Sequence, residues 1–240
     1  MHKVVVPVFQ PIVEIETGGV SHYEALARAR EGSAGHVRLI ELGEHYGFID
    51  LIDMAMMEKV FRLLHDQPNA VLAVNVSVGT IEQSCSDVLS LVFKNMDLVR
   101  RLVFEITETV EIRDMGRISR FVQAVRLLNA RVAIDDFGAG FFTLPLVREI
   151  QPEFLKLSCN LVADMNRTAD EILRLKEQIR GYGGEIIAEH VDSHEKLNTL
   201  RRLGVRYAQG YLLGVPTPML AVRPQLEVVS GAAVRAVGSR

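Results

Sequence analysis

Residues 131–140 read Arg131-Val-Ala-Ile-Asp135-Asp136-Phe137-Gly138-Ala139-Gly140, and this stretch decides the fold. Its apolar residues alternate up to Ile134, two adjacent carboxylates follow, and two glycines come soon after. This is the pattern of a buried strand that ends in a glycine-rich loop. Adjacent strand-end carboxylates diverge, so they pack poorly together but can hold a cation and its neighbour from different directions. The stretch therefore predicts half of a metal site.

The composition limits the class of protein. With 240 residues, 48% of them hydrophobic, the chain is long enough for one large core. A formal net charge of -3 gives no electrostatic footprint for a nucleic acid polymer or an anionic membrane. Cys85 and Cys159 form no CxxC pattern and suit a reducing compartment. No secretory signal and no apolar run of about 18 residues is present, so we expect a cytoplasmic protein without a membrane span.

Strands and helices are expected to alternate after an initial hairpin. Residues 3–9 and 20–27 are predicted strands, and the short turn at Thr17-Gly18-Gly19 implies that they are antiparallel. Further strands are predicted at 71–75, 102–108, from Arg131, at 154–157, 185–189 and 206–209, and helices at 37–46, 50–65, 80–95, 116–129, 143–149, 169–182 and 193–203. Repeated strand–helix units of this number favour an α/β fold, a TIM-like (β/α)8 barrel with an antiparallel first strand. Residues 1–225 are expected to form one domain, and 226–240 a loosely held tail.

Polar residues recur at the predicted strand ends. They stand at Asn75, Glu105, Asp135, Lys156 and Glu189, at intervals of thirty, thirty, twenty-one and thirty-three residues. Since one βα unit takes about 30 residues, successive units bring these side chains to the same mouth of a barrel, and Glu24 can join them from the second strand. A single strand-end acid is as often a helix N-cap or an ion-pair partner, but six polar residues in phase favour a site.

The chemistry of this set predicts divalent cations. Crowded carboxylates would repel one another in a low-dielectric mouth unless a cation offsets them, and oxygen ligands without imidazole or thiolate suit Mg²⁺ or Mn²⁺. Asp135 can bridge two ions while Asp136 serves the second, an arrangement typical of phosphodiester hydrolysis. Lys156 can orient the attacking water or offset phosphoryl charge, and Glu189 can hold the second ion or accept a proton.

Eight short motifs lie along the chain in a characteristic order. They are Phe9-Gln10-Pro11-Ile12-Val13, Glu24-Ala25-Leu26-Ala27-Arg28, Asn75-Val76-Ser77, Glu105-Ile106-Thr107-Glu108, Asp135-Asp136-Phe137-Gly138, Leu155-Lys156, Ala188-Glu189 and Gln209-Gly210-Tyr211. In order and spacing they resemble the EAL-domain phosphodiesterases, which open cyclic di-GMP to linear pGpG. The resemblance covers about residues 5–217 and implies the modified TIM barrel of that family, with 1–225 as an EAL phosphodiesterase domain.

The resemblance also implies roles for individual residues. It implies two ions, Mg²⁺ or Mn²⁺, the first held by Glu24, Asn75, Glu105 and Asp135 and the second by Asp135, Asp136 and Glu189. Lys156 is implied to orient the hydrolytic water, with Gln209 beside it. Gln10, Leu26 and Arg28 are implied to contact cyclic di-GMP, Arg28 through phosphate. Glu108 resembles the glutamate that couples dimerisation to metal binding, so we expect a homodimer and a regulatory protein partner.

The loop Phe137-Gly138-Ala139-Gly140-Phe141-Phe142-Thr143 lacks hydroxyls that the family has, and three further positions depart from the pattern of the family. Ser158 stands where the family has aspartate, His190 where it has glycine, and Asp192 where it has glutamate. These departures are expected to weaken the second metal position. They motivate one alternative, a receptor that binds cyclic di-GMP without cutting it, and a further one, a protein-interaction module that has lost the nucleotide.

Overall fold

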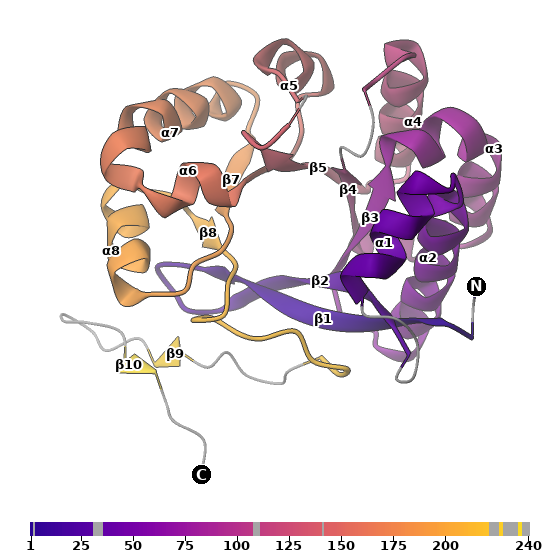
Figure 1. The fold of residues 1–240 in the computed structure, drawn as a ribbon, viewed down its shortest axis with the longest axis horizontal. Coiled ribbons are helices and arrows are strands. Elements are labelled where there is room, and N and C mark those ends of the chain that lie inside the picture. The colour runs from indigo at the N-terminus through magenta and orange to yellow at the C-terminus, as the bar shows by residue number, and fades with distance from the viewer. Residues whose placement is uncertain are drawn as a thin grey trace.

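Eight strands close into a barrel in the order β1-β2-β3-β4-β5-β6-β7-β8. The computed structural model describes residues 1, 3–30, 36–107, 111–140 and 142–220, with residues 36–38, 226–227 and 235–236 described by their backbone alone. The first two strands pair antiparallel and those from β2 to β8 pair parallel. Figure 1 shows the helices arranged around this ring of strands. The predicted α/β barrel with an antiparallel first strand is therefore confirmed.

The element bounds follow the predicted order of strands and helices. The strands are β1 (Val5–Glu14), β2 (Val20–Ala29), β3 (Leu72–Ser77), β4 (Leu102–Thr107), β5 (Arg131–Phe137), β6 (Phe154–Leu157), β7 (Glu185–Ala188) and β8 (Tyr207–Ala208). The helices are α1 (His36–His45), α2 (Ile49–Asp66), α3 (Val78–Lys94), α4 (Met115–Leu127), α5 (Leu144–Ile150), α6 (Cys159–Ala163), α7 (Met165–Arg180) and α8 (His194–Arg202), with a 3-10 turn at η1 (Val99–Arg101). No described helix combines the length and the apolar character needed to cross a membrane.

A small antiparallel pair stands near the end of the chain. It consists of β9 (Leu226–Glu227) and β10 (Arg235–Ala236). The rest of the tail predicted for 226–240 lies outside the described residues, so that domain boundary stays a prediction.

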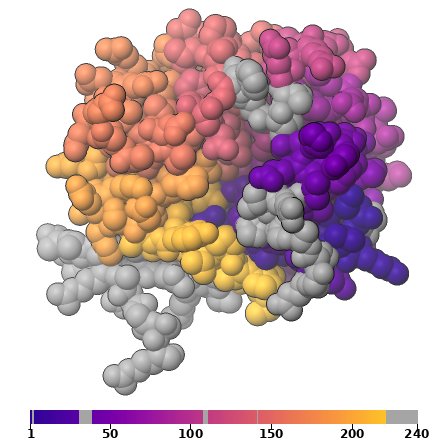
Figure 2. Space-filling model, viewed as in Figure 1, coloured from indigo at the N-terminus to yellow at the C-terminus, as the bar shows by residue number. Residues whose placement is uncertain are grey.

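Strand β1 continues beyond the predicted end at residue 9 and passes through Pro11. The Phe9 N–H points away from β2 and donates to the Thr217 carbonyl at 2.7 Å. The Pro11 nitrogen faces the same side, where β8 pairs only with Val13 and Glu14, so the missing N–H costs no ladder bond. Figure 2 shows the segment that contains Thr217, in yellow, lying against the indigo N-terminal strands.

An apolar layer inside the barrel supports the polar strand ends. It is formed by Ile12, Ala73, Val103, Ala133, Phe154 and Ile187, with Tyr207 packed against it. Side chains of a strand alternate between its two faces, so a residue two positions from a layer member faces the interior one level away. The side chains in that position are Gln10, Asn75, Glu105, Asp135, Lys156, Glu189 and Gln209. Each barrel strand other than β2 thus delivers one polar side chain above the layer, and β2 delivers Glu24, two residues after the buried His22.

The alternate strand residues point outward and pack against the helices. Phe104 and Phe121 meet edge to face, with ring centroids 5.6 Å apart, and join β4 to α4. Met56 and Met57 of α2 are buried in the same outer core, as expected for core methionines. This packing fixes the distance between each strand and its helix.

A buried carboxylate ties α2 to the end of β3. Asp53 Oδ2 accepts hydrogen bonds from the Ser77 N–H at 2.9 Å and from the Thr80 hydroxyl at 2.6 Å. The Ser77 hydroxyl in turn accepts from the Thr80 N–H at 3.0 Å and caps α3. Because Ser77 follows Asn75 by two residues, this network fixes the strand end that carries Asn75. Burial raises the pKa of Asp53 to about 6.

We predict that Asp53→Asn removes a pH dependence of the stability. Since the folded-state pKa of Asp53 lies above its unfolded value, the wild-type chain loses stability as the pH rises through that folded pKa. An asparagine can keep both acceptor contacts without this charge. Between pH 4.5 and pH 7.5 the wild type should therefore lose about 2 kcal/mol relative to the variant. Urea unfolding of both chains across this range measures the difference, and parallel pH profiles would contradict the prediction.

Candidate functional site

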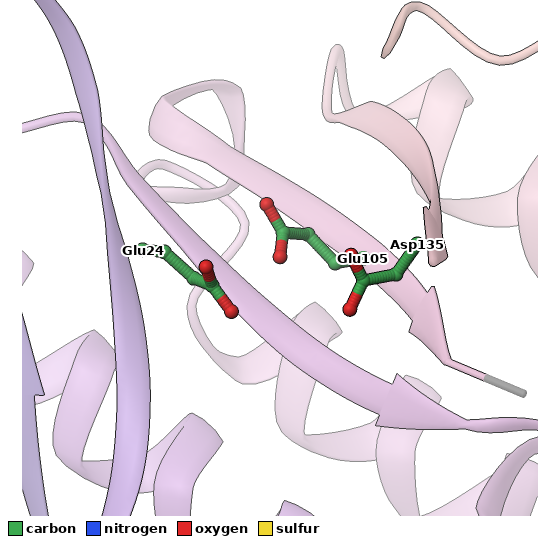
Figure 3. Close-up of side chains that lie close together, drawn as sticks. All are labelled: Glu24, Glu105 and Asp135. Carbon is green, nitrogen blue, oxygen red and sulfur yellow. The ribbon is translucent and has the colours of Figure 1, made fainter. Parts of the chain in front are cut away.

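Three carboxylates from separate strands converge at the barrel mouth. Glu24 comes from β2, Glu105 from β4 and Asp135 from β5, and one oxygen of each lies within 4.8 Å of the others. Figure 3 shows the three side chains pointing toward one another from their strands. Glu105 is 0% exposed and Glu24 only 4%, so this negative charge is buried. Such a cluster needs a positive charge between its members.

A single ammonium supplies part of that charge. Lys156 Nζ lies 2.8 Å from Asp135 Oδ1 and 2.9 Å from Glu105 Oε2. It also lies 3.1 Å from Glu189 Oε1 and 3.2 Å from Glu24 Oε2, and its side chain is 1% exposed. One ammonium faces four carboxylates, so at full ionisation the group keeps a net negative charge.

The pKa shifts reflect this excess. Burial raises the pKa of Glu105 well above its ordinary value, and the neighbouring Glu24 charge adds to the shift. Burial also raises the pKa of Glu189 well above the ordinary value, against the opposing effect of Lys156. Burial would lower the pKa of Lys156, but the surrounding carboxylates outweigh it and hold that pKa well above its ordinary value. The ammonium therefore stays charged at neutral pH, and the carboxyl groups compete for protons or cations.

Glu105 and Asn75 each have one buried side-chain oxygen that accepts no hydrogen bond among the described residues. These oxygens are Glu105 Oε1 and Asn75 Oδ1. Asn75 Nδ2 donates to Glu24 Oε1 at 3.0 Å. This hydrogen bond uses the amide N–H and leaves the amide oxygen of Asn75 without a donor. Unpaired buried acceptors beside unbalanced carboxylates fit a divalent cation, and the purely oxygen donor set suits Mg²⁺ or Mn²⁺.

Two glutamine side chains hold Glu24 in place. Gln209 Nε2 donates to Glu24 Oε2 at 2.6 Å and to Gln10 Oε1 at 3.1 Å. Gln10 Nε2 then donates to the Gly214 carbonyl at 3.0 Å. This chain of amides links the first strand, the second strand and the segment after β8. The predicted residues Gln10 and Gln209 are thus in contact with each other and with the acidic cluster.

Asp136 faces the same mouth but outside the buried cluster. It is exposed and has a φ of 50°, and the pairing of β5 with β6 shifts register between Ile134 and Phe137. The irregularity turns the chain out of the strand directly after Asp135. Asp136 and Glu189 therefore line the open side of the site.

A pocket of about 480 Å³ opens beside the cluster. Its wall includes the predicted residues Gln10, Glu24, Leu26, Arg28, Asp135, Asp136, Glu189 and Gln209. A neighbouring pocket of about 290 Å³ shares Leu26 and Arg28 and extends to apolar side chains of α1 and α2. Arg28 lies between the two pockets and donates one guanidinium N–H to the Ala27 carbonyl at 2.9 Å, and burial lowers its pKa.

The departures from the family pattern have different surroundings. Ser158 is fully buried, does not line either pocket, and its Oγ lies beside Gly138 of the loop after β5. Its hydroxyl has no hydrogen-bond partner among the described residues. His190 and Asp192 do line the larger pocket. Glu108 lies outside the described residues, so its predicted role stays a prediction.

Sequence reasoning did not assign two features of the pocket. The Gly214 carbonyl anchors Gln10, and Pro216 lines the wall, although both lie after the last predicted strand. No local pattern marks a backbone acceptor of this kind. His190 is a departure from the family pattern, and its place in the wall follows only from the backbone.

We predict that Lys156→Met strongly destabilises the chain in the absence of divalent cations. The substitution leaves buried carboxylates without their ammonium, a loss of about 3–5 kcal/mol for a broken buried pair. Thermal unfolding in EDTA should show a large fall in Tm, and Mn²⁺ should restore part of it. Lys196→Met is the matched control, because that lysine pairs with the exposed Asp192 and should change Tm little. Equal effects of both substitutions would contradict the assignment.

Comparisons with known proteins agree with this geometry. Residues 2–216 match the family described as "EAL domain". A relative from Escherichia coli K12 named "Probable cyclic di-GMP phosphodiesterase PdeI" is 32% identical over 229 residues, which are 89% of this chain and 29% of that protein. The chain thus spans less than a third of that relative.

Solved structures show the same fold. A Klebsiella pneumoniae BlrP1 structure titled as a manganese and cyclic di-GMP complex has a TM-score of 0.75 and 26% identity, covering 89% of this chain and 56% of that one. An EAL domain protein from Listeria monocytogenes has a TM-score of 0.80 at 19% identity, covering 90% and 89% of the two chains. With its barrel, its acidic mouth and a family match over nearly its whole length, the chain belongs to the EAL domain family.

Proposed function

We propose that this chain hydrolyses cyclic di-GMP to linear pGpG with two divalent cations, Mg²⁺ or Mn²⁺. The observation that carries the proposal is the buried set of three converging carboxylates with an unpaired amide oxygen and an unpaired carboxylate oxygen beside them. Relatives named cyclic di-GMP phosphodiesterases and the manganese and cyclic di-GMP complex of BlrP1 support the choice of substrate and cofactor.

In this proposal the metal ligands come from adjacent strands. Glu24, Asn75, Glu105 and Asp135 would hold the first ion, and Asp135, Asp136 and Glu189 the second. Divalent ions bound there supply charge that polarises a phosphodiester and make bound water more acidic. The oxygen-only donor set and its buried negative charge support this assignment.

The remaining residues have roles in positioning and binding. Lys156, held among four carboxylates, orients the attacking water and offsets negative charge that develops on the phosphoryl group. Gln209 holds Glu24 in its ligating orientation through the 2.6 Å hydrogen bond. Gln10, Leu26 and Arg28 line the adjacent pocket and would contact the dinucleotide, with the Arg28 guanidinium facing a phosphate.

A receptor that binds cyclic di-GMP without cutting it is the second candidate. Lys156 already offsets part of the acidic charge, so the pocket can form without a divalent cation. Calorimetry with and without divalent ions, followed by chromatography of the nucleotide, separates the two functions. A receptor binds in EDTA and returns the ligand intact, whereas the enzyme returns pGpG when Mn²⁺ is present.

We predict that Asp135→Asn abolishes most of the turnover. Incubation of the wild-type chain with cyclic di-GMP and Mn²⁺ should yield pGpG, and EDTA should stop the reaction. Removing the carboxylate that would bridge both ions should lower kcat by at least about 100-fold. Product quantified by chromatography measures the effect.

The matched control is Glu177→Gln on the exposed surface of α7, where the side chain is 74% exposed. This variant should keep the wild-type rate, because it removes a carboxylate far from the pocket wall. Turnover that survives EDTA, or an Asp135→Asn chain as active as the control, would reject the proposed mechanism.

A homodimer, a regulatory protein partner and a cytoplasmic location complete the proposal. Sedimentation velocity of the chain with and without Mn²⁺ and cyclic di-GMP tests the first of these. A dimer population that grows when both are present would support coupling between assembly and metal binding. A monomer under all conditions would reject the homodimer.

A further inference from the structure

His190 has a backbone conformation that favours glycine. Its φ is 54°, in the left-handed region, where the close approach of Cβ to the backbone costs free energy. Asp136 has a φ of 50° in the equivalent place. Each of the two directly follows an interior acid at a strand end, Asp135 in one case and Glu189 in the other, and both line the larger pocket. The chain therefore places one residue with a strained backbone on each of two sides of the same pocket.

Contacts on both sides fix the backbone of His190. The Glu189 N–H donates to the Leu157 carbonyl at 3.3 Å, and the Val191 N–H donates to the Gln209 carbonyl at 3.0 Å. Lys196 Nζ donates to the His190 carbonyl at 3.2 Å. A Cβ on Gly210 would overlap the Val191 backbone, so the two segments pack at the closest approach that glycine allows. The surroundings thus fix the backbone from which the exposed His190 side chain extends at the pocket wall.

The pocket offers few free side-chain donors for an anionic ligand. Five carboxylates line it, those of Glu24, Asp135, Asp136, Glu189 and Asp192. The amide nitrogens of Gln10 and Gln209 already donate to Gly214, Gln10 and Glu24. Arg28 and Tyr211 are further donors, but Tyr211 is 70% exposed, at the rim. The imidazole of His190 makes no hydrogen bond with the described residues and stands next to Glu189, on the side where the second cation would lie.

We infer that His190 is a ligand-contacting residue whose ring N–H donates to a phosphate oxygen of the bound cyclic dinucleotide. The inference rests on the proposed function, because that function supplies the ligand. A neutral imidazole carries one N–H, and a hydrogen bond to a charged phosphate is among the stronger ones in proteins. The donor offsets the acidic wall at the point where a phosphodiester must approach it, and this gain outweighs the backbone strain.

The test compares ligand affinity and stability in the same variants. His190→Gly removes the donor and relieves the backbone strain, so it should raise Tm while weakening cyclic di-GMP binding by about ten-fold or more. His190→Asn tolerates the left-handed backbone and keeps a donor, so its affinity should lie between the two. Calorimetry in Ca²⁺ and in EDTA measures the dissociation constants, and differential scanning measures Tm.

Gln151→Gly is the matched control. Gln151 has a φ of 49° at the end of α5, away from both pockets, so its replacement should raise Tm similarly and leave affinity unchanged. A His190→Gly chain that binds as tightly as the wild type, or more tightly, overturns the inference while the proposed function stands. A wild-type chain that binds no cyclic di-GMP in either condition overturns the proposed function and the inference with it.

Discussion

The barrel depends on one ammonium among four carboxylates. Lys156 Nζ lies within 3.2 Å of an oxygen from each of Glu24, Glu105, Asp135 and Glu189, and the group is almost fully shielded from water. Charges in such surroundings interact strongly, and an unpaired member would cost several kcal/mol. Without divalent cations the acids therefore need the lysine to balance their charge at the mouth, and the lysine cannot be buried without them. Because of this mutual requirement, the folding of the barrel depends on the residues of the site.

Strand geometry then decides which side chains reach that ammonium. Each polar side chain that faces the barrel interior at the mouth lies two residues from a residue of the apolar layer or, in β2, from the buried His22, which packs against Phe154. In β1 the direction is reversed, so Gln10 precedes Ile12 instead of following it. The antiparallel strand thus supplies its polar residue before its layer residue in the sequence, whereas the other strands supply theirs after it.

Much of this arrangement was predictable from the sequence because it repeats. Asn75, Glu105 and Asp135 recur at the length of one strand–helix unit, and parallel units of constant length place their ends together. The barrel and its antiparallel first strand followed from the same repeat and from a three-residue turn. The motifs quoted from the sequence also pointed to the family that the chain belongs to.

Other features depend on contacts that no local pattern encodes. Gln209 meets Gln10 across 199 residues, and only closure of the barrel brings them together. Ser158 lies behind the loop after β5 because β6 ends at Leu157 and α6 begins directly after Ser158. This helix is too short to show a periodic pattern in the sequence. The extension of β1 through Pro11 depends on which side of the strand lacks a ladder partner.

The ring of strands is most thinly paired around β8, which shares two residue pairs with β1 and two with β7. β1 and β8 share only the pairs Val13 with Ala208 and Glu14 with Tyr207. An isolated bridge between Phe9 and Thr217 joins β1 to the segment after β8. Amide protons along this seam should exchange with solvent sooner than those of β3, β4 and β5, which share at least three residue pairs with the neighbour on each side. A transient parting of the seam would separate Gln209 from Gln10 and from Glu24, while Glu24 would keep its contacts with Asn75 and Lys156. The contacts at the barrel mouth are therefore expected to break in a fixed order, with those across the β1–β8 seam first.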